Sequence, residues 1–123
     1  MRNDQIIFVP KRTDISAVTG DFDVIQISTF GEFPVCNGKR KLQLVFNDDG
    51  ESFTADMAKQ ILAFAAECEN DLMVHCEMCV SRSPAIAAAL TKIRGGEDHA
   101  YFKKYVPNMH VYTTILRVHH VGS

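Results

Sequence analysis

Short apolar blocks alternate along the chain with polar segments that contain glycine and proline. Four of these blocks predict strands, over residues 5–9, 22–28, 41–46 and 72–74. The second block is apolar on both faces, around Val24-Ile25-Gln26-Ile27. That pattern is typical of a central strand covered by helices on each side, because neither face alternates with polar residues exposed to water.

A longer block, residues 52–68, has apolar residues at three- and four-residue spacing and predicts the clearest helix of the chain. Ser52 is expected to cap its first turn, because a serine side chain can accept a hydrogen bond from the free N–H groups there. The apolar face of this helix is expected to lie on the core and consists of Phe53, Met57, Ile61, Phe64, Ala65 and Cys68.

Three further helices are expected in the last third of the chain. An alanine-rich helix runs through residues 85–93, with Pro84 in its first turn, where a missing N–H costs nothing. Residues 99–105 and 111–118 predict two final helices. Their side chains expected to face inward are Phe102, Val111, Ile115 and Val118.

Two connections near the N-terminus are less regular. Residues 13–18 predict a short helix or turn that ends at Gly20. Asn37-Gly38 fits either a hairpin turn or a loose turn, and the loose turn is favoured. Strands that alternate with helices predict an α/β fold, with a central, mostly parallel sheet of about four to five strands flanked by helices. We expect residues 1–123 to form a single domain.

Composition limits the classes of protein that fit. Hydrophobic residues make up 46% of the 123 residues, charged residues 23%, and the net charge is −2. These values are ordinary for a globular protein, and we expect no nucleic-acid or membrane partner. No apolar run approaches the roughly 18 residues of a membrane span. Four cysteines do not suggest a disulfide framework, so a reducing, cytoplasmic location is expected. The protein is also expected to be a monomer.

The stretch with the strongest candidates for catalytic side chains begins at His75-Cys76, where an expected strand ends, and runs to Arg82-Ser83, where a helix begins. A loop in this position directs backbone N–H groups and the positive end of a helix dipole at one point, which favours an anion such as phosphate. The same surroundings favour the thiolate form of Cys76 and make it a candidate nucleophile. Arg82 carries a planar fork of donors that can hold two oxygens of the same anion.

The order His75-Cys76, five residues, Arg82-Ser83 resembles the catalytic loop of the cysteine-dependent protein tyrosine and dual-specificity phosphatases. The resemblance implies a phosphatase-like fold with the phosphate-binding loop between strand and helix. It also implies that Cys76 attacks phosphorus, Arg82 binds the phosphoryl group, Ser83 stabilises the departing thiolate and His75 tunes the thiol. The loop residues expected to surround the phosphate are Glu77, Met78, Cys79, Val80, Ser81 and Arg82.

One loop residue departs from the family pattern. The family usually has glycine at the fourth loop position, and this chain has Cys79. A residue with a Cβ is expected to meet the backbone demand there only with strain.

A second candidate group lies upstream, in Asn47-Asp48-Asp49-Gly50. Phosphoryl transfer to a thiolate expels a poor leaving group unless an acid protonates it, and a loop carboxylate is a common donor. By resemblance to the region that carries this acid in the family, Asp48 is the expected general acid, and Asp49 is the close second. The local sequence alone also fits a simple turn made of two acids and a glycine.

The sequence therefore predicts metal-independent hydrolysis of phosphomonoesters through a phosphocysteine, without a cofactor. The expected substrate is phosphotyrosine, phosphoserine or phosphothreonine of a protein. Two alternatives stay open. The chain could be a catalytically weak phospho-binding module, or a thiol redox or arsenate-reducing protein that uses Cys76 and Cys79 in turn. A zinc site is not expected, because Cys36, Cys68 and the five histidines form no second paired cluster.

Overall fold

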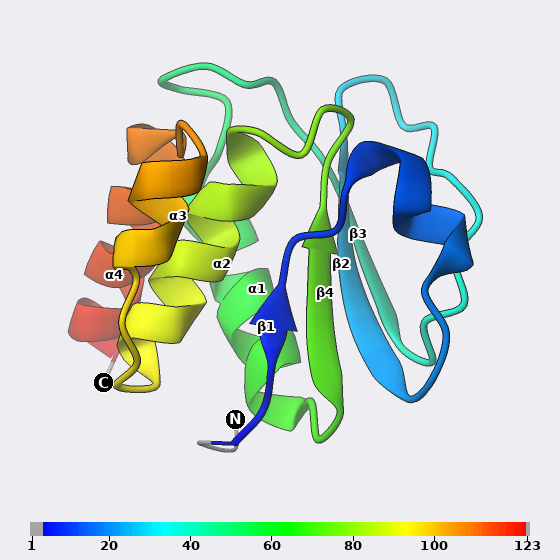
Figure 1. Ribbon diagram of the computed structural model, residues 1–123. Helices are drawn as coiled ribbons and strands as arrows, with labels where there is room; N and C mark the ends of the chain where they lie inside the picture. The colour runs from blue at the N-terminus through cyan, green and yellow to red at the C-terminus, as the bar shows by residue number, and fades with distance from the viewer. Residues whose placement is uncertain (1–3, 123) are drawn as a thin grey trace.

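The computed structural model describes residues 4–122 and contains a four-stranded sheet with helices beside it (Figure 1). All the predicted strands and helices are present, with shifts at their ends. In chain order the elements are β1 (Ile7–Phe8), the 3₁₀ helix η1 (Arg12–Ala17), β2 (Phe22–Ser28), β3 (Lys41–Val45), α1 (Ala55–Glu67), β4 (Asp71–His75), α2 (Arg82–Ile93), α3 (His99–Lys104) and α4 (Met109–Gly122).

The sheet has the strand order β1-β4-β2-β3, and every pair is parallel. Parallel pairing of β2 with β3 excludes a hairpin at Asn37-Gly38 and agrees with the loose turn. The turn passes close to β2, because a Cβ on Gly38 would lie 2.8 Å from a methyl carbon of Val24. Strand β1 is shorter than expected, since only two of its residues pair with β4, at the sheet edge.

The two faces of the sheet are covered differently. Helices α1 to α4 lie together on one face, whereas η1 and the irregular segment after β2 lie on the other (Figure 1). The sheet is flanked by helices as predicted, but among the described residues the second face carries only the 3₁₀ helix η1 and no α-helix. All seven residues of β2 are nevertheless buried. The second face is closed by a small apolar cluster whose buried members include Ile15 of η1 and Cys36.

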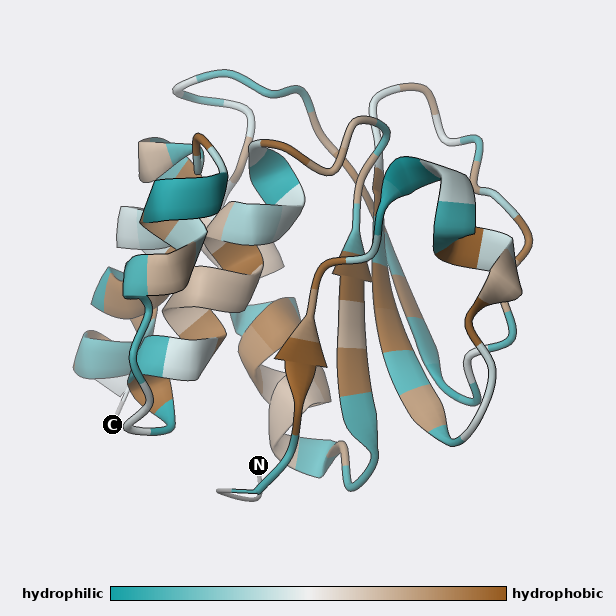
Figure 2. Cartoon of the chain, viewed as in Figure 1, coloured by the Kyte–Doolittle hydropathy of each residue, from teal (hydrophilic) through white to brown (hydrophobic). Residues whose placement is uncertain are grey.

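Helix α2 is the innermost helix, and its residues 82–91 are all buried. Its run of alanines gives the helix a small cross-section, so it packs closely between the sheet and α4. Figure 2 shows brown, apolar segments where the helices face the strands and teal, polar segments at the outer surfaces. The alanine-rich stretch therefore anchors the start of α2, which carries Arg82, against the core.

Two local predictions were wrong. Thr54 rather than Ser52 caps α1, since the Thr54 side chain accepts a hydrogen bond from the N–H of Met57. Phe102 does not face the core: it is 39% exposed, and its ring meets the edge of Tyr112 at the surface. Helix α3 has no buried residue, so it lies on the molecule rather than inside it.

Candidate active site

The loops after β2, β3 and β4 meet at the carboxyl ends of the strands, at the top of Figure 1. In a parallel α/β sheet this edge is where ligand sites form, because loops from neighbouring strands converge there. The loop between β4 and α2 contains residues 76–81 and leads directly into the first turn of α2. It is the same stretch that the sequence singled out.

The Cys76 sulfur lies under this loop, and the residue is only 3% exposed. It lies 3.1 Å from the Ser83 hydroxyl and accepts a hydrogen bond from the Cys79 N–H at 3.2 Å. Contact with the Cys79 thiol, followed by hydrogen bonds from Ser83 and the Cys79 N–H, outweighs burial and lowers the pKa of Cys76 to about 5. Cys76 is therefore a thiolate at neutral pH.

Cys79 lies at the loop position where the family usually has glycine. Its φ is 55°, the only positive value at a non-glycine residue in the part of the chain that the structure describes. The strain expected from the sequence is thus located at this residue. Its thiol can also donate to the Cys76 carbonyl oxygen, 3.3 Å away. The neighbouring Cys76 sulfur and burial raise the pKa of Cys79, which therefore stays protonated.

The Arg82 guanidinium extends from the first turn of α2 beneath the loops, with 6% of its side chain exposed. Its Nη1 donates to the Phe46 carbonyl at 2.7 Å and to the Thr29 hydroxyl at 3.0 Å. Its Nη2 donates to the Glu77 carboxylate at 2.9 Å. Arg82 therefore connects the loops that follow β2, β3 and β4.

The Asp48 carboxylate lies opposite, in the loop after β3. Its Oδ1 accepts hydrogen bonds from the Ser81 hydroxyl at 2.9 Å and from the Asn108 amide at 2.8 Å. It shares a cavity of about 290 Å³ with Cys76. The residues that line this cavity are Asp48, Cys76, Met78, Val80, Ser81 and Arg82.

The neighbouring Asp49 has a different environment. Its carboxylate accepts hydrogen bonds from the Ser52 hydroxyl and from the N–H groups of Glu51 and Ser52, and these lower the pKa of Asp49 to about 2. These hydrogen bonds direct the Asp49 carboxylate at its own turn and disfavour its protonated form. Asp49 therefore organises the turn before α1, and Ser52 belongs to that turn, two residues before the capping residue Thr54.

His75 is buried behind Cys76 at the end of β4. Burial lowers the pKa of His75 to about 4, so its ring is neutral at neutral pH. Its Nε2 lies 3.0 Å from the side-chain amide nitrogen of Gln26, which fits an amide donor and an imidazole acceptor. Gln26 also accepts a hydrogen bond from Gln43. A polar ladder across β4, β2 and β3 thus fixes the histidine ring.

Comparison with solved structures finds the same architecture in phosphatases. A variant of human DUSP28 superposes with a TM-score of 0.69 at 18% identity, over 98% of this chain and 93% of that one. PTPMT1 in complex with PI(5)P superposes with a TM-score of 0.66 at 16% identity, over 98% of this chain and 94% of that one. Human tyrosine phosphatase-like serine/threonine/tyrosine-interacting protein superposes with a TM-score of 0.61 at 18% identity, over 84% of this chain and 79% of that one.

This protein has the dual-specificity phosphatase fold. At such low identity the likeness establishes the fold and not the chemistry. No protein-family model matches the chain, and no curated protein sequence matches it. In the phosphatase fold of this chain, the order Cys76 to Arg82 occupies the loop between the last strand of the sheet and the helix that follows it.

The predicted site residues are largely brought together, although their roles remain predictions. Cys76, Arg82 and Asp48 line one cavity, and Ser83 and His75 contact or support Cys76 from below. Two of the loop residues, Glu77 and Cys79, do not line that cavity. Cys79 is buried in the small apolar cluster on the second face of the sheet. The Glu77 side chain turns toward Thr29 and Arg82 and lines a second depression of about 300 Å³ beside the first.

The sequence interpretation did not assign Asn108, Gln26 or Thr29 a role in the site. Asn108 donates to Asp48 Oδ1 and to the Asp49 carbonyl, and its own Oδ1 accepts from Val111 at the start of α4. The sequence feature that could have indicated Asn108 is the Pro-Asn step that it forms with Pro107 just before a helix. For Gln26 it is a polar residue within the apolar run Val24-Ile25-Gln26-Ile27. Thr29 had no comparable signal, because its partners come from a distant loop.

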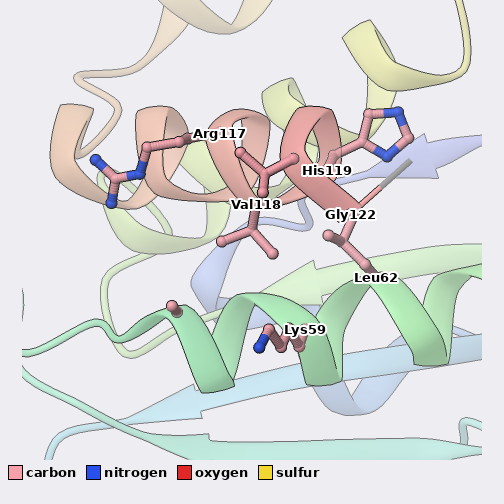
Figure 3. A pocket seen from close by; sticks show the side chains of 8 residues that line it. Lys59, Leu62, Arg117, Val118, His119 and Gly122 are labelled. Atoms are coloured by element: carbon pink, nitrogen blue, oxygen red, sulfur yellow. The ribbon is translucent and has the colours of Figure 1, made fainter.

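A larger cavity, of about 680 Å³, lies between α1 and α4 and shares no lining residue with the site (Figure 3). Lys59 and Leu62 of α1 and Arg117 and Val118 of α4 are among the residues that line it. Across residues 4–122, no three His, Cys, Asp or Glu side chains are grouped so that they could hold a metal ion. None of the helices described is long and apolar enough to span a membrane.

Proposed function

We propose that this protein hydrolyses phosphomonoesters through a phosphocysteine intermediate on Cys76. The observation that supports this most directly is the convergence of a thiolate, a guanidinium and a carboxylate on one cavity, from Cys76, Arg82 and Asp48. Each has a distinct task in phosphoryl transfer: nucleophile, charge stabiliser and proton donor.

In the first step, the Cys76 thiolate attacks phosphorus, an S–P bond forms, and the bond from phosphorus to the leaving oxygen breaks. The protonated Asp48 carboxyl gives its proton to that oxygen, which departs as an alcohol or phenol. Loop N–H groups and Arg82 bind the equatorial oxygens, where negative charge is spread in the transition state.

In the second step, a water molecule attacks the phosphocysteine and gives a proton to the Asp48 carboxylate. The S–P bond breaks, inorganic phosphate is released, and Asp48 regains the proton that it spent. Cys76 leaves as a thiolate, and the Ser83 hydroxyl, 3.1 Å from the sulfur, stabilises it. The low pKa of Cys76 serves both steps, since a stable thiolate is both present before attack and a good leaving group afterwards.

The substrate class that the rim of the cavity supports best is the phosphorylated side chain of a protein. Met78 and Val80 at the rim are 60% and 44% exposed, so the cavity opens to an apolar surface rather than to a deep channel. Such a shallow site admits phosphoserine and phosphothreonine as well as phosphotyrosine. A phosphoinositide is the alternative to include in a substrate panel, because PTPMT1 has a similar structure and was solved with PI(5)P.

The test is hydrolysis of para-nitrophenyl phosphate by reduced protein in the presence of a metal chelator. Wild-type protein is expected to hydrolyse this substrate, and the rate for Cys76→Ser is expected to fall to the background rate without protein. Cys68→Ala is the matched control, because it removes another buried thiol away from the cavity and is expected to retain activity. Equal turnover by wild type and Cys76→Ser would overturn the proposal.

Thiol redox chemistry is a second candidate, favoured by the contact between the Cys76 and Cys79 thiols. It requires both sulfurs, since reduction of a substrate by a dithiol leaves a disulfide. Hydrolysis requires only Cys76. Turnover that survives replacement of Cys79 therefore supports the phosphatase, and loss of all activity with either cysteine would support the redox protein.

A further inference from the structure

We propose that Glu77, with Thr29, is a positioning residue that holds Arg82 in the orientation that binds the phosphoryl group. This inference rests on the proposed function and concerns the same site. Glu77 follows the nucleophile directly in the chain, yet its side chain turns away from the phosphate cavity and toward Arg82.

The three side chains form a closed ring of hydrogen bonds. Arg82 Nη1 donates to the Thr29 hydroxyl at 3.0 Å, and that hydroxyl donates to Glu77 Oε1 at 2.5 Å. Arg82 Nη2 donates to the same Oε1 at 2.9 Å. Arg82 donates at both ends of the ring, the Thr29 hydroxyl accepts one hydrogen bond and donates the next, and Glu77 Oε1 only accepts. Because two nitrogens of the guanidinium are held at once, the ring fixes the rotation of its plane as well as its position.

Glu77 is anchored independently of Arg82. Its Oε1 also accepts a hydrogen bond from the Thr29 backbone N–H at 3.0 Å, and this donor comes from the loop after β2. The Thr29 hydroxyl, followed by Arg82, lowers the pKa of Glu77, so the carboxylate is ionised at neutral pH. A carboxylate held by a loop backbone is suited to be the fixed end of the ring, with Arg82 as the part that it orients.

The ring leaves donors of Arg82 for the substrate. Nη1 spends both hydrogens on Thr29 and Phe46, and Nη2 spends one on Glu77. The Nε–H and the second Nη2–H lie on the other edge of the guanidinium and can grip two oxygens of a phosphoryl group. Glu77 therefore binds the guanidinium on a different edge from the one that a phosphate would use. It can orient Arg82 without competing with the substrate for the same donors.

The test compares Glu77→Ala, Glu77→Gln and the control Glu32→Gln. Glu32 is an exposed acid at the neighbouring depression, so its variant removes a nearby negative charge without removing a contact to Arg82. Glu77→Ala is expected to lower kcat/KM for para-nitrophenyl phosphate by about 100-fold, with KM raised and kcat lowered, because a misplaced guanidinium affects both binding and transition state.

Rescue by conservative variants separates positioning from a merely structural role. Glu77→Gln keeps an oxygen acceptor and is expected to recover most of kcat/KM, and Thr29→Ser is expected to be near wild type while Thr29→Val is impaired. Loss of kcat/KM that only tracks a lower Tm, with no difference between Glu77→Ala and Glu77→Gln, would overturn the proposal. Glu32→Gln is expected to match wild type.

Calorimetric titration with inorganic phosphate gives a readout that does not depend on turnover. Wild-type affinity for phosphate is expected to fall about tenfold or more in Glu77→Ala. If wild-type protein binds phosphate but fails to hydrolyse the aryl phosphate, the proposed function fails while this comparison still tests the ring. Unchanged or tighter phosphate binding by Glu77→Ala would show that Glu77 does not position Arg82, and would overturn the inference.

Discussion

Cys79 combines backbone strain with electrostatic control of the nucleophile. Its φ of 55° costs about 1–2 kcal/mol for a residue with a Cβ, and glycine would avoid that cost. Its thiol and N–H meanwhile lie against the Cys76 sulfur and help to lower the Cys76 pKa. A chain that tolerates strain at this position keeps a sulfur contact that glycine cannot supply.

Replacement of Cys79 should therefore shift the titration of Cys76. Contact with the Cys79 thiol is the largest cause that lowers the Cys76 pKa to about 5, so Cys79→Gly and Cys79→Ala are both expected to raise it toward the ordinary value of 9.0. The thiolate is the reactive form, so the acid limb of kcat/KM moves to higher pH.

The pH dependence of Cys76 alkylation by iodoacetamide measures this shift without substrate. Cys79→Ala keeps the Cβ and the strain, and Cys79→Gly removes both, so a shared shift assigns the effect to the thiol. An alkylation profile that stays at the wild-type pH in both variants would contradict the role given to Cys79.

At the scale of single residues, the sequence identified what lies within one contiguous loop. Cys76, Arg82 and Ser83 have a spacing that carries chemical meaning by itself. The partners that orient them do not: Thr29 and Asn108 reach the site only because distant loops fold to the same edge of the sheet. Hydrogen-bond partners contributed by long-range contacts leave almost no local pattern, and this limits what one sequence can show.

At the scale of elements, the loop between β3 and α1 divides two adjacent acids between two environments. Asp48 lines the cavity, and Asp49 is held by Ser52 and the turn backbone. The sequence could not separate them, because both follow the same strand. Their side chains differ only in direction, which the turn decides.

Asparagine substitutions test that division. Asp48→Asn is expected to lower kcat for phenyl phosphate by about 100-fold or more, because the leaving phenoxide loses its proton donor. The loss should be smaller for para-nitrophenyl phosphate, whose leaving group needs less help. Asp49→Asn should keep kcat and lower Tm instead, since an amide is a weaker acceptor for the three donors that surround Asp49. The opposite pattern would assign the acid to Asp49.

Most elements followed from hydrophobic periodicity, and the misplacements have physical causes. The cap of α1 is Thr54, because the turn that Ser52 forms with Asp49 continues the loop and the helix begins only at Ala55. Strand β2 was correctly placed as a buried central strand, but one of its faces is covered by η1 and an irregular segment. Periodicity reports that a face is buried, and it does not report what buries it.

At the scale of the whole molecule, the site depends on three strand ends meeting at one edge of a parallel sheet. Arg82 bonds to groups that follow β2 and β3 while it is carried by the helix that follows β4. The α/β order of the chain predicted this meeting point, and the likeness to solved phosphatases confirms the architecture. The reaction stays a proposal that chemistry must test.

The most direct test of that proposal is to trap the intermediate. The Asp48→Asn variant is mixed with para-nitrophenyl phosphate, and the reaction is quenched with acid. With this substrate the first step needs little help from an acid, whereas hydrolysis of the phosphocysteine in the second step lacks its base, so the intermediate accumulates. Mass spectrometry of the peptide containing Cys76 is expected to show one added phosphoryl group, absent from the Cys76→Ser protein. Protein-dependent turnover without any phosphoryl group on Cys76 would contradict the account.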